Sequence, residues 1–295
     1  MKKLNQLLFM LLVVILLNLV GCEMKNNLKS EEQTKVESKT SQVIADTQWS
    51  DTMQIHWNHR VYLPKEYEEN LDKKYPVLYV LHGWGGNVTN TTDETRIDSK
   101  SILDKLIDDK EIEPMIVVFV DGFNSYYVDG PTFKMESAII NDLIPLIDAK
   151  YRTLNDKNNR SIAGISMGGF GALNIGLSNS DMFNSVGLMS PAIWDTIEED
   201  NSIYGSPLVE KYYENSYKNL LDEVKSRDIN IFVYHGKDDE VITYDNIENF
   251  ISFAKESGFN IKYELQEEGP HAWPTWREMY PKVLKDISNN FKKFE

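Results

Sequence analysis

The sequence predicts an α/β fold with a mainly parallel central sheet and helices on both faces of that sheet. Apolar strand-like runs alternate with amphipathic helical segments from about residue 49 to the end of the chain, and this alternation is typical of parallel strands joined by helical crossovers. A chain of 295 residues, 41% of them hydrophobic, can bury a large core, and single domains of this size are common. We therefore expect one folded domain at 49–295.

Strands are expected where short apolar runs end at glycine, proline or polar turn residues, and helices where apolar residues recur at helical spacing. The expected strands are 53–64, 76–83, 115–122, 160–166, 185–192, 229–236 and 261–269. The expected helices are 99–109, 135–151, 168–177, 208–224, 244–257 and a last one from about Trp276. Only short turns separate the early strands, so we expect them to pair antiparallel at one edge of a parallel sheet.

The first residues have the pattern of a secretory signal peptide at 1–21. Lys2 and Lys3 precede the apolar run 7–20, which is short for a membrane span. The run ends in Leu19-Val20-Gly21-Cys22, which resembles the bacterial lipobox, where the signal is cut before the cysteine and its thiol is acylated. We expect an exported protein that lipid on Cys22 holds to the outer face of the bacterial cell membrane.

The segment 22–48 is expected to be a flexible tether between the lipid and the domain. It consists mainly of Lys, Glu, Ser, Thr, Asn and Gln, with almost no large apolar side chains. Such a segment cannot bury enough apolar surface to offset the entropy that ordering costs.

The formal net charge of −15 makes nucleic acid an unfavourable partner, because its phosphates would be repelled. The sequence contains no His-Glu-x-x-His motif, no Cys/His cluster and no dinucleotide-binding glycine loop, which are the patterns of common metal and cofactor sites. We expect neither a metal nor a cofactor.

The stretch Gly164-Ile165-Ser166-Met167-Gly168 joins the expected strand 160–166 directly to the expected helix 168–177. A serine on such a tight turn is exposed above the sheet, and flanking glycines avoid collisions with the strand and the helix. The N–H groups of the helix favour negative charge near that serine. A glycine-rich turn with a capping serine shows the same five residues, but the strand and helix around them favour a nucleophile.

A serine hydroxyl needs a base that takes its proton, and the base needs an acid that orients it. After such an elbow the expected chain order is serine, acid, histidine. Among five histidines, His271 alone lies in a loop after the last expected strand, so it is the expected base. His56 and His59 lie in the first strand or turn, and His235 precedes the acid loop, so structural roles are expected for them.

The acid is expected in the loop after the strand 229–236. Three carboxylates follow one another there, Asp238, Asp239 and Glu240, and spacing alone does not choose among them. Asp121 is a less favoured alternative, because its pairing with Gly122 is typical of a turn.

An oxyanion hole requires two backbone N–H groups. Met167 directly follows the nucleophile, and the glycine-rich loop 82–86 after an early strand is placed to supply the second amide. The aromatic residues Trp84, Tyr126, Tyr127 and Trp194 lie in loops after strands. These loops leave carboxyl ends of strands, so we expect them to converge above the serine, where the rings suit a planar acyl group or a sugar ring. An equally ordinary use of such rings is to pack the loops.

Five segments together resemble the esterase family that includes esterase D, the mycolyltransferase antigens and the feruloyl esterase domains of bacterial xylanases. They are "PVLYVLHGWGG", "DLIPLIDAKYR", "RSIAGISMGGFGALNIGL", "VYHGKDDEV" and "GPHAWPTWRE". The resemblance extends from about Met53 to the C-terminus and is greatest to the feruloyl esterase branch. It implies an α/β-hydrolase fold, Ser166 as nucleophile and His271 as base. It also places the acid on Asp239, because members read Gly-x-x-Asp after that strand.

The same resemblance places the oxyanion amides on Trp84 and Met167. It implies a serine carboxylesterase that forms an acyl-serine, acting on small-molecule or polysaccharide esters, with feruloyl or acetyl groups of xylan favoured. Loops around "NSYYVDGPTF" and "SPAIWDTIEEDNSIYGS" vary greatly among feruloyl members, so the substrate does not carry over. The alternatives are an acyltransferase, a small-acyl general esterase and a non-catalytic carbohydrate-binding lipoprotein. The complete set of Ser166, Asp239 and His271 argues against the last.

Overall fold

The structure is a computed structural model, and it describes residues 40–195, 216–224 and 226–292. The expected signal peptide, Cys22 and most of the expected tether lie outside these residues, as does the first half of the expected helix 208–224. In the described part of the chain, no helix combines the length and the apolar character that crossing a membrane requires.

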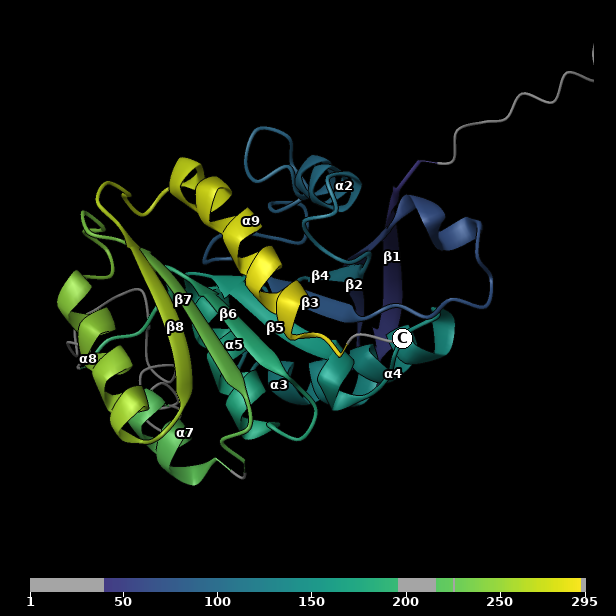
Figure 1. The fold of residues 1–295 in the computed structure, drawn as a ribbon. Helices are drawn as coiled ribbons and strands as arrows, with labels where there is room; N and C mark the ends of the chain where they lie inside the picture. The colour runs from purple at the N-terminus through teal and green to yellow at the C-terminus, as the bar shows by residue number, and fades with distance from the viewer. Residues whose placement is uncertain (1–39, 196–215, 225, 293–295) are drawn as a thin grey trace, which may run out of the picture. The chain divides into compact units, whose positions relative to one another are not determined.

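A mixed sheet of eight strands forms the centre of the domain (Figure 1). The strands are β1 (Gln42–Ser50), β2 (Ile55–Leu63), β3 (Val77–Leu81), β4 (Ile116–Val120), β5 (Arg160–Ile165), β6 (Ser185–Met189), β7 (Asn230–Gly236) and β8 (Asn260–Gln266). Their order across the sheet is β1-β2-β4-β3-β5-β6-β7-β8. The pairs β1–β2 and β2–β4 are antiparallel and the other pairs are parallel. The centre of the sheet is parallel and one edge is antiparallel, as expected. The expected strands 53–64 and 76–83 do not pair with each other, however, because β2 pairs with β1 and β4.

The neighbour of β2 is β4, although β3 follows β2 in the chain. Every residue of β3 is buried, whereas β2 alternates between exposed and buried residues over its first half. A strand that is apolar on both faces is stable only with a helix layer on each side, so β3 lies in the interior of the sheet and β2 near its edge.

The folded part begins earlier than the sequence predicts, because β1 occupies residues within the expected tether. Its residues pair with β2 from Gln42 to Ser50. Val43 and Ile44 pack against the cores on the two faces of the sheet, and Ser41 Oγ donates a hydrogen bond to Asp104 at 2.7 Å. The strand is held mainly by backbone pairing along an edge, which leaves little apolar pattern in the sequence.

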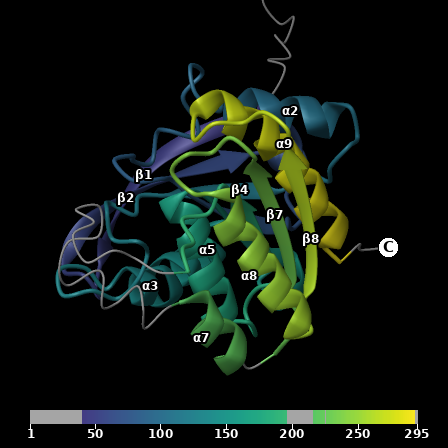
Figure 2. The same ribbon diagram turned by 90° about the vertical axis from the view of Figure 1, so that its left-hand side faces the viewer.

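Helices cover both faces of the sheet, as the sequence predicts (Figures 1 and 2). One face carries α2 (Ser99–Asp108) and α9 (Trp273–Asn290), and the other carries α3 (Met135–Ala138), α4 (Ile144–Lys150), α5 (Met167–Ser178), α7 (Tyr217–Glu223) and α8 (Tyr244–Glu256). The sheet therefore separates two apolar cores. Helix α5 is buried over almost its whole length, so the turn at its start is anchored in the interior of the domain.

The expected helix 135–151 forms in three parts rather than one. A π-helical turn, η2 (Ile139–Leu143), separates α3 from α4. Pro145 lies in the first turn of α4, and because proline has no N–H, it removes a regular helical hydrogen bond and favours such a bulge. The last helix begins at Trp273, three residues before its expected start at Trp276.

Candidate active site

Ser166 lies at the junction of β5 and α5, where the backbone leaves no room for side chains. A Cβ atom on Gly164 would lie 2.0 Å from the carbonyl oxygen of Gly168. A Cβ atom on Gly168 would lie 2.3 Å from the carbonyl oxygen of Leu81 in β3. Since real side chains cannot approach so closely, both positions require glycine, and the tight turn that the sequence predicts depends on them.

The backbone of Ser166 adopts φ 55° and ψ −116°, a conformation that residues other than glycine rarely adopt. Its N–H donates a hydrogen bond to the carbonyl of Met189 at 2.9 Å, and its carbonyl accepts one from the N–H of Ala192 at 2.9 Å. These bonds to β6 and the loop after it hold the strained residue in place.

The structure brings Ser166, His271 and Asp239 together from three separate loops. Ser166 Oγ lies 2.8 Å from His271 Nε2, and His271 Nδ1 lies 2.7 Å from Asp239 Oδ2. An ionised carboxylate only accepts hydrogen bonds, so the proton of the neutral imidazole belongs on Nδ1. Nε2 is then free to accept the proton of the serine hydroxyl. This is the geometry of a nucleophile with its base and orienting acid.

Asp239 is 3% exposed, and its environment favours the ionised form. Its Oδ1 atom accepts hydrogen bonds from the N–H of Val241 at 3.0 Å and of Ile242 at 2.8 Å. Burial alone would raise the pKa of Asp239, but the hydrogen bond from His271 and those from the backbone together hold this pKa below its ordinary value. The carboxylate therefore stays charged beside the imidazole.

The other carboxylates of the loop lie elsewhere. Asp238 Oδ1 accepts a hydrogen bond from the N–H of Gly269 and so ties the loop that carries His271. Glu240 is exposed. Asp121, the less favoured alternative, lies beside His82, with 3.4 Å between Asp121 Oδ1 and His82 Nε2. Of the three neighbouring carboxylates, Asp239 is the one whose side chain contacts His271.

The remaining histidines lie in structural settings. His235 is 1% exposed, with its Nδ1 atom 4.0 Å from Asp239 Oδ2, and burial lowers its pKa. His59 lies in β2 with its Nε2 atom 3.6 Å from Asp46, and His56 packs edge-on against Trp49. His82 Nε2 accepts a hydrogen bond from the N–H of Gly122 at 2.9 Å.

The two residues expected to supply the oxyanion amides, Met167 and Trp84, lie near the serine: one follows it in the chain and the other lines the same cavity. Met167 is the first residue of α5, so its N–H has no acceptor within the helix. Gly83 lies against the serine, since a Cβ atom there would be 3.5 Å from Ser166 Cβ. A turn closed by the N–H of Gly86 and the carbonyl of Gly83 at 3.1 Å contains Trp84, whose own N–H that turn does not use.

A cavity of about 290 Å³ opens over Ser166 and His271. Trp84, Tyr126 and Trp194 line it, as the sequence suggests. The cavity has four further lining residues that the sequence pattern does not predict, Ala192, Val241, Trp273 and Trp276. The two tryptophans follow His271 within "HAWPTW". Because they lie so near the expected base in the chain, the sequence could have indicated them as lining residues. Trp276 meets the imidazole of His271 edge-on, with ring centroids 4.9 Å apart.

Tyr127 does not occupy the place that the sequence suggests for it. Its side chain is fully buried, and its hydroxyl donates a hydrogen bond to the carbonyl of His82 at 3.1 Å. Tyr127 therefore supports the loop beside the cavity and does not line it.

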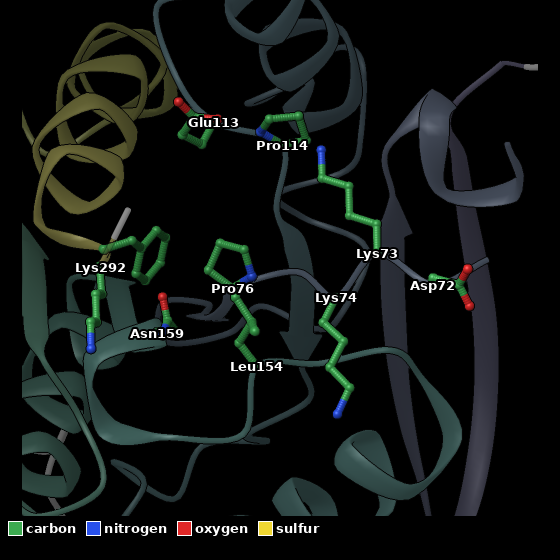
Figure 3. A pocket seen from close by; sticks show the side chains of 10 residues that line it. Asp72, Lys73, Lys74, Pro76, Glu113, Pro114, Leu154, Asn159 and Lys292 are labelled. Carbon is green, nitrogen blue, oxygen red and sulfur yellow. The ribbon is translucent and has the colours of Figure 1, made fainter. Parts of the chain in front are cut away.

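A larger cavity of about 500 Å³ lies where the parallel strands begin, with Pro76 ahead of β3 and Asn159 ahead of β5 (Figure 3). Its charged residues are of both signs, and Figure 3 shows the side chains of Lys73 and Lys74 pointing in opposite directions. Ligands of open α/β sheets bind at the carboxyl ends of the strands, so we assign the reactive site to the smaller cavity. Within the described ranges, no three His, Cys, Asp or Glu side chains are placed to share a metal ion.

Comparison with known proteins gives a consistent result. The chain matches the model of the family described as "Putative esterase" over residues 50–287. It is 28% identical over 249 residues to an endo-1,4-beta-xylanase/feruloyl esterase of Xylanibacter ruminicola, covering 82% of this chain but only 30% of that relative. It is 25% identical over 246 residues to an acetyl esterase of Caldicellulosiruptor saccharolyticus, covering 76% of this chain and 88% of the relative. The solved structure of a ferulic acid esterase superposes with a TM-score of 0.77 and 32% identity, over 85% of this chain and 99% of its own.

Replacing Ser166 by Ala should abolish labelling by a fluorophosphonate probe and lower ester hydrolysis by at least about 10³-fold, since the hydroxyl is the group that would bond to the acyl carbon. Gel fluorescence and p-nitrophenyl acetate turnover measure both effects. Labelling of the Ser166→Ala protein at the level of the unchanged protein would contradict the assignment.

Asp239→Asn should lower kcat by about 10³- to 10⁴-fold, because an amide no longer favours the imidazole tautomer that leaves Nε2 free to accept the proton. Asp238→Asn is the matched control. Its side-chain oxygen still accepts the N–H of Gly269, so kcat should stay within about threefold of the unchanged protein. If Asp238→Asn has the larger effect on kcat, the acid is Asp238.

Proposed function

This chain belongs to that esterase family and is a carboxylic ester hydrolase with an α/β-hydrolase fold; from that premise we propose that it is an exported serine esterase that removes feruloyl or acetyl groups from plant polysaccharides through an acyl-serine intermediate. The observation that carries the proposal is the continuous hydrogen-bonded series from Ser166 Oγ through His271 to Asp239, at the base of a cavity with aromatic walls.

In the first half of the reaction, Ser166 Oγ attacks the carbonyl carbon of the ester while His271 Nε2 takes the hydroxyl proton. The carbonyl oxygen becomes an oxyanion, which the amides of Met167 and Trp84 stabilise. His271 then gives its Nε2 proton to the alcohol oxygen, the carbon–oxygen bond to the alcohol breaks, and the acyl group remains on Ser166. Asp239 stays ionised throughout and stabilises the imidazolium that forms.

In the second half, a water molecule attacks the acyl carbon and His271 Nε2 takes one of its protons. The same two amides hold the second oxyanion. When that oxyanion collapses, the bond to Ser166 Oγ breaks and the serine oxygen regains a proton from His271. The carboxylic acid leaves and the enzyme returns to its starting state. If an alcohol attacked the acyl-serine in place of water, the acyl group would be transferred to that alcohol as a new ester.

The walls of the cavity support an aromatic acyl group or a sugar. The rings of Trp84 and Tyr126 pack against each other at a tilt of 44° with centroids 5.6 Å apart, and Trp273 and Trp276 meet edge-on at 4.9 Å. Trp84 is 44% exposed and Val241 is 48% exposed, so the rim is apolar and open to solvent. A planar acyl ring packed against these aromatic walls, with the rest of a bulky ester outside, matches this shape.

The narrow cavity also favours a second candidate. About 290 Å³ is near the lower limit for sites that hold drug-sized ligands, and one relative is named an acetyl esterase. A small-acyl esterase would use the same serine and differ only in what the aromatic walls contact.

Changing Trp194 to Ala distinguishes these substrates. If Trp194 contacts a feruloyl ring, the KM for methyl ferulate should rise about fivefold, since one aromatic contact contributes on the order of 1 kcal/mol. The KM for p-nitrophenyl acetate, whose acyl group is too small to reach the wall, should change less than twofold. Trp49→Ala, at an exposed site on β1, is the control and should change neither. Equal effects of Trp194→Ala on both esters would favour the small-acyl esterase.

Export and lipid attachment are part of the same proposal and rest on the sequence pattern at 1–22. Cys22→Ala should prevent incorporation of labelled palmitate and should move the protein from the membrane fraction to the soluble fraction of the producing bacterium. Palmitate labelling that persists in this variant would contradict attachment through Cys22.

A further inference from the structure

We propose that Tyr127 and Asn124 are positioning residues that hold the loop 82–86 in the shape its oxyanion amide requires. The inference rests on the proposed acyl-serine chemistry, because it concerns the Trp84 amide. We call residues 82–86 the oxyanion loop and residues 121–128 the β4 loop, since the latter follows β4. The β4 loop contributes one lining residue to the cavity, Tyr126, and other residues of this loop bond to the oxyanion loop.

The β4 loop holds an unusual backbone. Phe123, Tyr126 and Tyr127 all have positive φ values, of 48°, 55° and 59°. Residues with side chains rarely adopt such values, and they persist only where surrounding contacts impose them. Three positive φ values in one short loop therefore indicate that contacts with the rest of the protein hold the backbone in a conformation that these residues do not favour by themselves.

Three hydrogen bonds join the β4 loop to the oxyanion loop. The hydroxyl of Tyr127 donates to the carbonyl of His82 at 3.1 Å, and the N–H of Gly122 donates to His82 Nε2 at 2.9 Å. The N–H of Gly85 donates to Asn124 Oδ1 at 2.8 Å. These three hydrogen bonds hold His82 and Gly85, the residues on either side of the Gly83-Trp84 pair.

Tyr127 cannot shift without moving its neighbours. A Cβ atom on Gly122 would lie 2.2 Å from its ring, and one on Gly171 of α5 would lie 2.6 Å from its Cβ. Its N–H donates to Ser125 Oγ at 3.0 Å. Burial raises the pKa of Tyr127 well above its ordinary value, so the phenol keeps its proton and remains a donor.

The position of the phenol connects the two halves of the oxyanion site. Its ring packs against α5, the helix that begins with Met167, and its hydroxyl fixes the peptide plane between His82 and Gly83. Rotation of that plane would move Trp84. An oxyanion donor has to lie within a few tenths of an ångström of its best distance, so loss of this fixation lowers the stability of the transition state rather than that of the bound substrate.

The test compares Tyr127→Phe with Tyr75→Phe. The Tyr75 hydroxyl is also buried and also donates to a backbone carbonyl, that of Glu66 at 3.2 Å, but Tyr75 lies ahead of β3, at the other end of the sheet. For p-nitrophenyl acetate, Tyr127→Phe should lower kcat about tenfold with KM within twofold, the pattern of an interaction made only in the transition state. Tyr75→Phe should leave both constants within twofold.

Asn124 offers a rescue experiment and an independent measurement. Asn124→Ala should lower kcat about tenfold, whereas Asn124→Asp, which keeps an oxygen acceptor for the N–H of Gly85, should recover most of it. The affinity for a trifluoromethyl ketone, which forms a tetrahedral oxyanion on the serine, should fall in proportion to kcat/KM across these variants.

The outcomes separate this inference from the proposed function. Unchanged kcat and unchanged ketone affinity in Tyr127→Phe, with Ser166→Ala inactive, would overturn the positioning role and leave the serine mechanism standing. An active Ser166→Ala protein would overturn the serine mechanism itself. If Tyr127→Phe and Tyr75→Phe lower kcat by the same factor, Tyr127 contributes only to the general stability of the fold. That result would also overturn the positioning role.

Discussion

The close backbone contact of β3, β5 and α5 beneath Ser166 is the constraint on which the rest of the site depends. Gly164 and Gly168 let the strand, the helix and the end of β3 approach to distances that no Cβ atom allows. The strained φ of Ser166 is stable because α5, buried over almost all its length, cannot move away. The serine is thereby held at a closely packed junction of the sheet and α5.

A second constraint is the charge buried at Asp239. Transfer of a carboxylate from water into the protein is unfavourable unless hydrogen bonds replace the lost hydration. Two backbone N–H groups and His271 supply them, and the nearby His235, whose pKa burial lowers, adds no hydrogen bond to the carboxylate at 4.0 Å. Asp238 accepts a hydrogen bond from the N–H of Gly269 and so connects its own loop to the loop that carries His271. Adjacent residues of one loop thus serve two functions, orientation of the base and attachment of its loop.

The walls of the cavity come from segments far apart in the chain. The loops after β3, β4, β6 and β7 and the start of α9 each contribute lining residues, because the carboxyl ends of parallel strands meet at one edge of the sheet. Ser166 thus lies at the buried junction of β5 and α5, whereas most of the cavity walls come from loops outside the sheet. Such a division is consistent with relatives of this chain that are named for different acyl groups.

The sequence by itself determined the alternation of strands and helices, the parallel centre of the sheet, the strand-to-helix turn at Ser166 and the chain order of serine, acid and histidine. These features follow from local patterns, in which neighbouring residues decide burial and backbone conformation. Only the tertiary structure decided that Asp239 rather than Asp238 meets His271, that Tyr127 points into the protein while Tyr126 lines the cavity, and that residues from Gln42 onward form an edge strand. Each of these depends on hydrogen bonds and packing between segments distant in the chain, such as β1 with β2 or the β4 loop with the oxyanion loop. Two adjacent residues of the same type look equivalent in the sequence, yet their side chains can point in opposite directions. Which of the two faces a given partner is therefore decided only when the distant segments come into contact.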